Sequence, residues 1–216
     1  MTSLTSEDLT TRLAKLPDPQ RRGAPKGVTD KGQPRGDHEL NPELYDPGQA
    51  LRQAAVLVPI VLNAAGPSLL LTRRTAHLKH HSGQIAFPGG GAEPGDGTPE
   101  ETALREAEEE VGLDRSRTEI FGRLDTYVTR TGFDVTPVIG LLRPPLALTL
   151  QESEVEIAFE VPLGFFLDPA SRKIDSRLYA GATRYFYAFP YNKYYIWGAT
   201  AGMINNLVEV LTGKEV

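Results

Sequence analysis

The 216-residue sequence contains no cysteine, which excludes disulfides, thiolate nucleophiles and cysteine-based zinc sites. It also lacks a basic surplus, because 23 Lys and Arg stand against 28 Asp and Glu, a formal charge of −5. That balance argues against a protein that binds nucleic acid through its overall charge. No Gly-x-Ser-x-Gly motif occurs, so a serine hydrolase is not supported.

Long uninterrupted apolar runs are missing as well. Residues 53–72 carry no charge, but a turn-forming cluster at 63–68 divides them. This favours two paired, buried strands over a membrane-spanning helix. Residues 1–13 lack the apolar centre of a signal peptide. We therefore expect a soluble, cytoplasmic protein with no membrane partner.

Composition divides the chain near residue 50. Residues 1–50 are predicted to form a helix over 3–16 and then an arm rich in proline, glycine and charge, whose residues 17–47 contribute no core element. Residues 51–216 are predicted to form the main domain. Because its expected strands and helices mix without strict alternation, they favour an α/β or α+β sandwich with a mixed sheet. The strands are expected at 54–62, 68–74, 119–128, 133–142, 155–161, 173–179 and 184–189, with an apolar stub at 84–87.

Two helices are expected in the main domain. The first has the better-defined ends: Thr98 is a typical N-cap, Glu101 is predicted to complete a capping box, and Gly112 closes the helix. The second, over 200–211, has one apolar face.

The first of these helices holds four glutamates in five positions. At about 100° per residue, Glu106, Glu109 and Glu110 share one narrow arc, whereas Glu108 falls outside it and is expected to be solvated or paired. Three carboxylates on one face repel each other unless a cation lies between them, and hard oxygen ligands suit Mg²⁺ or Mn²⁺. Arg105 lies four residues before Glu109 and can brace it. The alternative is a solvated acidic surface.

The residues before this helix favour the metal site. A strand end and a glycine-rich turn precede it, with the sequence Phe87-Pro88-Gly89-Gly90-Gly91. Glycines let backbone N–H groups approach an anion closely, so Gly89 and Gly90 are candidate phosphate contacts. The combination indicates metal-assisted chemistry on a diphosphate.

Residues 90–113 resemble the Nudix box, the loop–helix motif of hydrolases that cleave nucleoside diphosphates linked to another moiety. The matching core reads Arg105-Glu106-x-x-Glu109-Glu110-x-Gly112-Leu113. At one position the chain departs from the box, which has a Glu eight residues before the Arg; here that residue is Gly97, with Asp96 beside it. The resemblance implies an α/β/α sandwich with a mixed sheet and a Mg²⁺-dependent or Mn²⁺-dependent hydrolase.

Residues 69–90 are similar to the coenzyme A pyrophosphatase branch of that family. The similar residues are Leu70-Leu71-Thr72-Arg73-Arg74-Thr75, Lys79, Gly83 and Ile85-Ala86-Phe87-Pro88-Gly89-Gly90. This branch implies hydrolysis of coenzyme A or a derivative to 4′-phosphopantetheine and adenosine 3′,5′-bisphosphate. It also tends to carry Asp at the place of Asp96, which we count as a candidate substrate-binding residue. The alternatives are ADP-ribose, NADH or dinucleoside polyphosphates as substrates, or a non-catalytic nucleotide-binding module.

The one dense basic run covers residues 73–81. Arg74 and Lys79 are predicted to contact the phosphates of coenzyme A, including the 3′-phosphate. The alternative is a positive loop that only balances the acidic helix. His80 and His81 are adjacent and have no cysteine partner, which argues against zinc.

Two glutamates are candidates for accepting the proton of the attacking water. Glu154 lies in a polar loop before a strand, whereas Glu109 is predicted to bind the cation and to pair with Arg105. Basicity therefore favours Glu154, with Glu109 mainly a ligand. If it has no such role, Glu154 is an ordinary turn residue.

The C-terminal part is rich in aromatic side chains, including six tyrosines and Trp197 after residue 178. We assign them to core packing and to the interface of a homodimer. The alternative is stacking on an adenine.

Overall fold

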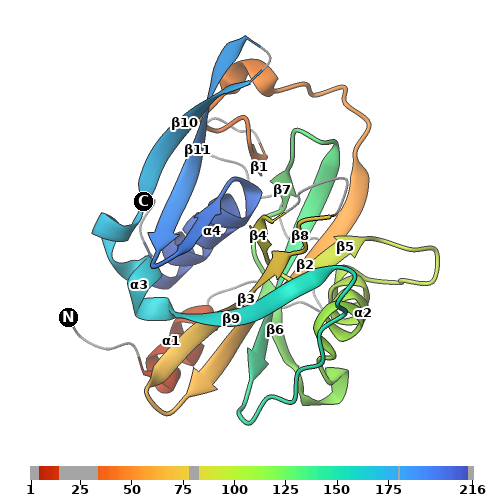
Figure 1. Cartoon of the computed structure of the whole chain (residues 1–216), viewed down its shortest axis with the longest axis vertical. Coiled ribbons are helices and arrows are strands. Elements are labelled where there is room, and N and C mark those ends of the chain that lie inside the picture. Colours follow the sequence, from red (N-terminus) through yellow and green to blue (C-terminus); the bar gives the residue numbers. More distant parts are fainter. Residues whose placement is uncertain (1–4, 15–33, 78–82, 180, 214–216) are drawn as a thin grey trace.

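The computed structural model describes residues 5–14, 34–77, 83–179 and 181–213, and within them the main feature is a nine-stranded mixed sheet (Figure 1). At its centre, β2 (Arg52–Asn63) runs parallel to β8 (Phe133–Leu142) along most of both strands. β3 (Gly66–Arg74) pairs antiparallel with β2, and β9 (Val155–Pro162) with β3. The shorter strands are β1 (Arg35–Gly36), β4 (Ile85–Ala86), β5 (Gly89–Gly91), β6 (Glu119–Arg123) and β7 (Tyr127–Val128).

Both faces of this sheet are apolar because β2 alternates its side chains between two cores. Even positions enter one core and odd positions the other: Ala54, Val58 and Ile60 on one face, and Ala55, Leu57 and Val61 on the other. A sheet with two apolar faces needs a helix layer on each side.

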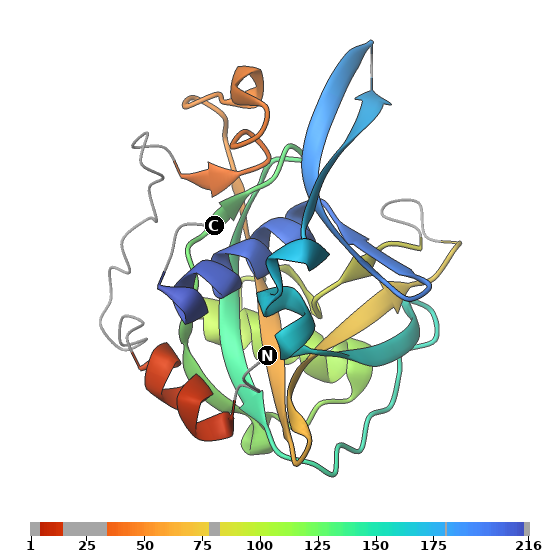
Figure 2. The same cartoon turned by 90° about the vertical axis from the view of Figure 1, so that its left-hand side faces the viewer.

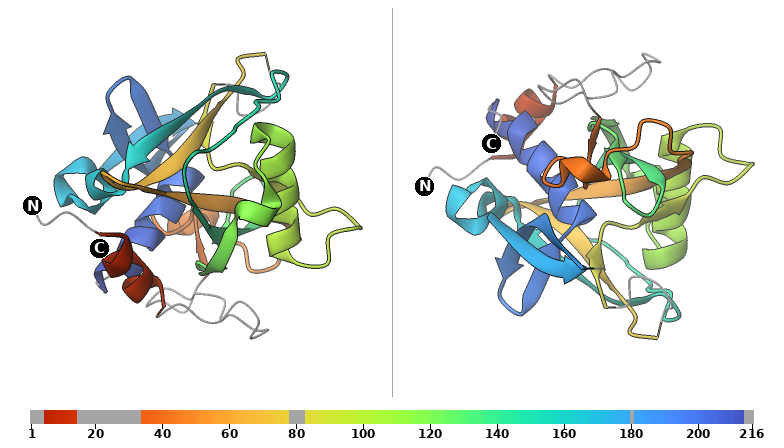
Figure 3. Two further views of the ribbon diagram at one scale, coloured as in Figure 1. Left: turned by 90° about the horizontal axis from the view of Figure 1, so that it is seen from below. Right: turned by 90° about the horizontal axis from the view of Figure 1, so that it is seen from above.

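Helices supply those two layers (Figure 3). α2 (Pro99–Val111) packs on one face, and α1 (Ser6–Leu13), α3 (Leu163–Leu167) and α4 (Ala199–Thr212) pack on the other. α1 inserts the fully buried Leu9 and Leu13 into the core beside α4, and Arg12 Nη1 donates to the carbonyl of Leu211 at 2.6 Å. The predicted α/β/α sandwich with a mixed sheet is confirmed.

Part of the N-terminal arm belongs to the sheet, which corrects the prediction that residues 17–47 contribute no core element. β1 pairs in parallel with β7, and the following turn is fixed by a hydrogen bond from Tyr127 Oη to Asp37 at 3.0 Å. A two-residue strand is too short to show a periodic pattern, so the sequence did not reveal it. Residues 17–33 lie outside the described residues.

A second, three-stranded antiparallel sheet consists of β10 (Lys173–Tyr179), β11 (Ala182–Tyr191) and β12 (Tyr194–Trp197). The β10–β11 hairpin projects from the body of the molecule (Figure 2). The predicted strand over 173–179 is confirmed, whereas β12 and α3 were not predicted because each spans only one turn or a few residues. Likewise, the strand predicted over 119–128 divides into β6 and β7. Three single-turn 3₁₀ helices span Pro42–Leu44, Arg115–Arg117 and Pro169–Ser171.

Among the helices described, none combines the length and the hydropathy that spanning a bilayer requires.

Candidate active site

The acidic helix α2 begins and ends where the sequence predicts. Thr98 Oγ1 accepts a hydrogen bond from the Glu101 N–H at 3.2 Å, and Gly112 closes the helix in the left-handed region at φ 65°. A side chain at Gly112 would also collide with Thr149 of the loop that packs there. The second half of the predicted capping box is wrong, because the Glu101 carboxylate accepts from the Gly97 N–H at 2.6 Å instead of from Thr98. The loop directs the Gly97 N–H toward the first turn of the helix, where it binds the Glu101 carboxylate in place of the Thr98 N–H.

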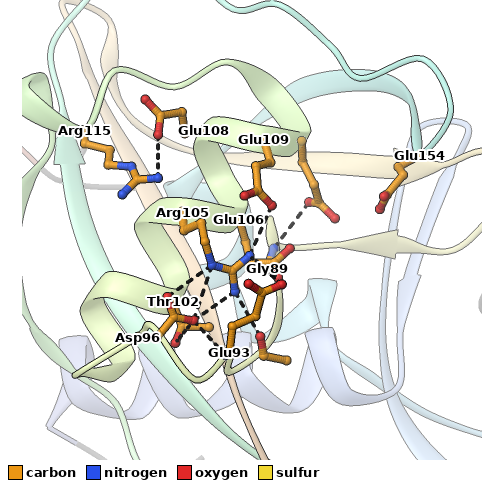
Figure 4. A network of polar contacts seen from close by, with 12 residues as sticks. Gly89, Glu93, Asp96, Thr102, Arg105, Glu106, Glu108, Glu109, Arg115 and Glu154 are labelled. Atoms are coloured by element: carbon orange, nitrogen blue, oxygen red, sulfur yellow. Dashed lines mark hydrogen bonds and ion pairs between the residues drawn. The ribbon is translucent and has the colours of Figure 1, made fainter.

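The carboxylates of α2 differ in where they point and in how exposed they are. Glu108 turns away toward Arg115, 2.5 Å away, whereas Glu106 and Glu109 lie beside Arg105 (Figure 4). Glu110 is buried, Glu106 is largely buried and Glu109 is exposed. The helix therefore separates one paired surface glutamate from a graded set of three.

Arg105 is the centre of a network that joins the loop to the helix. Its Nη1 donates to Glu106 at 3.0 Å and to Glu109 at 3.1 Å, which is the predicted pairing with Glu109. Its Nη2 donates to Asp96 at 2.9 Å and to the carbonyl of Gly91 at 3.0 Å. One planar guanidinium thus fixes two helix carboxylates relative to the glycine-rich strand β5.

Asp96 stands beside Arg105, next to the position where the chain departs from the Nudix box. Its carboxylate also accepts from Thr102 Oγ1 at 3.0 Å and from the Glu93 N–H at 2.9 Å. The Arg105 guanidinium and these hydrogen bonds hold the pKa of Asp96 well below its usual range. Among the described residues, Asp96 thus contacts Arg105, Thr102 and the Glu93 N–H. Its contact with a substrate stays a prediction.

Sequence reasoning missed two members of this network. Thr102 lies one turn before Arg105 on the same side of α2, so helical spacing could have identified it. Glu93 contributes a backbone N–H to Asp96, and a backbone donor leaves no signal in residue type.

Glu110 is the point where β3, β5 and α2 meet. Arg74 Nη1 lies 3.2 Å from Glu110 Oε1, and the Gly89 N–H donates to Oε2 at 3.3 Å. Burial raises the pKa of Glu110 to about 7, although the positive charge of Arg74 opposes this shift. The sheet thus brings a basic side chain from the upstream strand onto the acidic helix.

The glycines of β5 allow a close approach. A Cβ at Gly90 would lie 2.5 Å from Glu106 Oε1, and a Cβ at Gly89 would lie 2.5 Å from the carbonyl oxygen of Ala55. The backbone therefore excludes a side chain at Gly89, which allows strand pairing, whereas a side chain at Gly90 would displace the Glu106 carboxylate. Phosphate binding by Gly89 and Gly90 stays a prediction.

Glu154, another predicted site residue, lies at the edge of this region. Glu154 is half exposed, and its Oε2 lies 3.7 Å from Arg74 Nη2. Its carbonyl accepts from the Thr75 N–H at 2.9 Å, which ties the loop to the end of β3. Figure 4 shows the Glu154 side chain apart from the Arg105 group. Lys79 lies outside the described residues.

Comparison with known proteins identifies this arrangement. Residues 51–172 match the model of the NUDIX domain. The chain belongs to the Nudix family. It is 40% identical over 168 residues to the uncharacterized Nudix hydrolase NudL of Escherichia coli K12, covering 78% of this chain and 87% of that protein. The NudL of Shigella boydii is 41% identical with the same coverage.

Two solved structures show weaker similarity. A Caenorhabditis elegans Ap4A hydrolase has a TM-score of 0.45 and 23% identity, over 51% of this chain and 80% of that chain. The NUDIX domain of Shewanella oneidensis NrtR complexed with ADP ribose has a TM-score of 0.42 and 22% identity, over 59% and 82%.

This Nudix protein is a hydrolase that acts on pyrophosphate bonds, and such hydrolases generally use divalent metal ions such as Mg²⁺. The acidic face fits a cation in charge and in donor type. Among the described residues, the only hydrogen-bond donor to Glu106 and Glu109 is Arg105, which is also bound to Asp96. Burial raises the pKa of Glu106, although Arg105 opposes this shift. A cation bound beside this carboxylate would stabilise its charged form.

The three carboxylates do not yet form a closed cage. Within the part of the chain described, no three His, Asp or Glu side chains are gathered tightly enough to hold an ion. The reason is that Arg105 holds Glu106 and Glu109 while Arg74 holds Glu110.

Proposed function

We propose that this Nudix hydrolase cleaves the diphosphate bond of coenzyme A or a derivative, giving 4′-phosphopantetheine and adenosine 3′,5′-bisphosphate. The observation that carries the proposal is the convergence on Glu110. Arg74 and Gly89 come from the stretch that resembles coenzyme A pyrophosphatases, and both contact this glutamate of the Nudix box. The stretch that resembles coenzyme A pyrophosphatases and the acidic helix would therefore act on the same bound diphosphate.

Glu106, Glu109 and Glu110 would hold the divalent cation, Mg²⁺ or Mn²⁺, because hard carboxylate oxygens are the ligands these ions prefer. When bound, such a cation neutralises charge on the diphosphate and makes water more acidic. Arg105 orients Glu106 and Glu109 through its Nη1. Asp96 in turn fixes Arg105, so the loop before α2 positions the ligands without contacting the reacting atoms.

Arg74 is the chain's candidate for binding a substrate phosphate. It is partly exposed, and its buried Nε has no hydrogen-bond partner among the described residues. A guanidinium donates charge-assisted hydrogen bonds to phosphate oxygens, which would replace its pairing with Glu110. Lys79 is the second candidate from the sequence.

Glu154 accepts the proton of the attacking water in this proposal. Glu109 is less suited to that role because Arg105 donates to it at 3.1 Å, whereas the nearest basic atom to Glu154 among the described residues is 3.7 Å away. The water oxygen attacks one phosphorus of the diphosphate and breaks the bond between that phosphorus and the bridging oxygen. The bridging oxygen leaves with the other phosphate, so both products are phosphate monoesters.

Mass spectrometry of products from a panel of diphosphates incubated with Mg²⁺ tests the substrate. We expect the two coenzyme A fragments, and a kcat/KM for 3′-dephospho-coenzyme A at least about 10-fold lower, because a lost charge-assisted contact costs about 1.5–3 kcal/mol. Equal constants, or a preference for ADP-ribose, NADH or a dinucleoside polyphosphate, would overturn the coenzyme A proposal. No turnover of any substrate would indicate a binding module.

The proton acceptor is tested by the pH–rate profile of Glu154→Gln, with metal affinity measured in parallel. We expect the acidic limb to disappear while metal affinity is unchanged. Glu156→Gln is the matched control, because Glu156 is equally exposed and pairs with Arg73 instead of Arg74. A profile and rate equal to those of the wild type would return Glu154 to the status of a turn residue.

A further inference from the structure

The small sheet carries the exposed apolar surface of the described residues. Every large apolar or tyrosine side chain that is clearly exposed there belongs to β10, β11 or β12: Ile174, Leu178, Tyr179, Tyr185 and Tyr195. Leu178 is 74% exposed and Ile174 is 59% exposed. In the β10–β11 register, Ile174 and Leu178 share one face of the small sheet with Tyr185, which lies opposite Ser176. Exposed large apolar side chains that share a face mark an interaction site more often than scattered ones do.

β10 is also an edge strand. The strand order of the small sheet is β10-β11-β12, and no strand of the described residues pairs with the outer side of β10. All seven of its residues are exposed. The strand thus offers unpaired backbone N–H and C=O groups next to an apolar surface, which is a template for another strand.

The sequence of β10 is complementary to itself about Ser176. If a second copy is placed antiparallel with the two Ser176 residues opposite each other, Ile174 faces the partner's Leu178. In the same register, Asp175 faces the partner's Arg177, and both contacts occur twice because of the two-fold symmetry. We propose that two copies of this chain associate through antiparallel pairing of their β10 strands, centred on Ser176.

The charges of β10 favour a second copy over a different partner. Arg177 is opposite Arg184 in the β10–β11 register, and like charges directly opposite each other are destabilising. Arg184 is neutralised by Glu43, but no carboxylate of the described residues pairs with Arg177. Asp175 is exposed and is bound by Tyr195 Oη at 2.5 Å. A second copy supplies Arg177 with an acidic residue at the required position.

A strand pair of this length covers less surface than the ~800 Å² per partner of a typical stable interface, so the dimer is concentration-dependent in the range of about 1–100 μM. The hairpin lies on the side of the molecule opposite α2 (Figure 1), so dimer formation leaves the hydrolase site open. The two proposals can therefore fail independently.

Sedimentation velocity of the full chain over this concentration range tests the proposal. The wild type dimerises, whereas Asp175→Arg and Arg177→Asp each remain monomeric because like charges then meet across the interface. An equimolar mixture of these two variants dimerises again, since each then meets the opposite charge. The double variant Asp175→Arg/Arg177→Asp dimerises too, and Leu178→Lys remains monomeric.

Two controls separate pairing from misfolding. Glu119→Arg alters an exposed ion pair with Arg143 away from the small sheet and leaves dimerisation unchanged. Tyr195→Phe removes the hydrogen bond to Asp175 but keeps the negative charge of Asp175, and it also leaves the dimer intact. A wild type that stays monomeric at about 100 μM, or single-charge variants that dimerise as well as the wild type, would overturn the proposal.

Discussion

Two arginines of this molecule, Arg105 and Arg35, are each surrounded by carboxylates, and each is about equally buried. Arg35 contacts Asp125 at 2.9 Å and Glu39 at 3.6 Å, and it also pairs with Glu209. Arg105 contacts Asp96, Glu106 and Glu109 at similar distances. Residue types and charges alone do not distinguish the two clusters.

The clusters differ in what completes them. Every carboxylate around Arg35 has a second donor from the chain: Gly36 for Glu39, Asn206 for Asp125 and Asn205 for Glu209. Around Arg105, only Asp96 has such donors among the described residues, whereas Glu106 and Glu109 depend on Arg105 alone.

A carboxylate cluster whose hydrogen bonds are completed by the chain is a structural anchor; here it ties β1 to α4. A cluster with unfilled carboxylate oxygens on one side can bind a cation.

The largest effect is expected at the cluster around Arg105, here called the open cluster because its carboxylates have unfilled oxygens. Glu106→Gln lowers kcat by at least about 1,000-fold, because a divalent cation supplies several kcal/mol to the reaction and an amide is a poor ligand for it. The unfolding free energy changes little, since the amide oxygen can still accept from Arg105. Steady-state kinetics and urea denaturation measure both quantities. Glu108→Gln is the matched control with a near-normal rate, because Glu108 pairs with Arg115 away from the cluster.

At the cluster around Arg35, here called the closed cluster, we expect a loss of stability with no loss of activity. Arg35→Met lowers the free energy of unfolding by about 3–5 kcal/mol, because three largely buried carboxylates lose their cation. The activity per folded molecule is retained. Arg115→Met, which removes a surface pair, costs less than about 1 kcal/mol. An Arg35→Met protein that is as stable as the wild type but inactive would reverse the roles assigned to the two clusters.

A smaller loss is expected when the charge of the open cluster is kept and its shape is changed. Arg105→Lys lowers kcat by about 10–100-fold, because one ammonium group cannot bind Asp96 and two helix glutamates at once. Arg115→Lys is the control and has little effect. If Arg105→Lys retained the full rate, positioning by the guanidinium would be excluded.

The smallest effect concerns pH. The pKa of Asp96 is lowered from 3.8, mainly by Arg105, so the folded state binds this proton more weakly than the unfolded state. Its contribution to stability is therefore complete above about pH 4 and declines as pH falls toward the folded pKa. Denaturation curves should show wild type more stable than Asp96→Asn at pH 6, with a smaller difference near pH 3. A difference that is constant between these values would contradict the assigned pairing.

The parts of this picture that the sequence predicted are local. Arg105, Glu106 and Glu109 belong to one helix, whose geometry fixes their neighbours at four-residue spacing. The ends of α2 were predicted for the same reason, since Thr98 and Gly112 act on adjacent residues. The uncharged run over 53–72, divided by a turn-forming cluster, also predicted two paired, buried strands, which are β2 and β3.

The contacts that the sequence did not predict join distant segments. Arg74 and Glu110 are 36 positions apart, and Arg35 and Glu209 are 174 apart. Residue spacing carries no information about which strand edge lies against which helix, so only the sheet order brings these pairs together. The β1–β7 pairing escaped prediction for this reason as well as for its short length.

The central claim is that the unfilled carboxylates of α2 bind a divalent cation. The most direct measurement is a titration with Mn²⁺ in which electron paramagnetic resonance reports the unbound ion, independently of turnover. We expect the wild type and Glu108→Gln to bind Mn²⁺ with the same affinity, and Glu106→Gln/Glu110→Gln to lose that binding while remaining folded. Equal Mn²⁺ binding by all three proteins, or none by the wild type, would contradict the account.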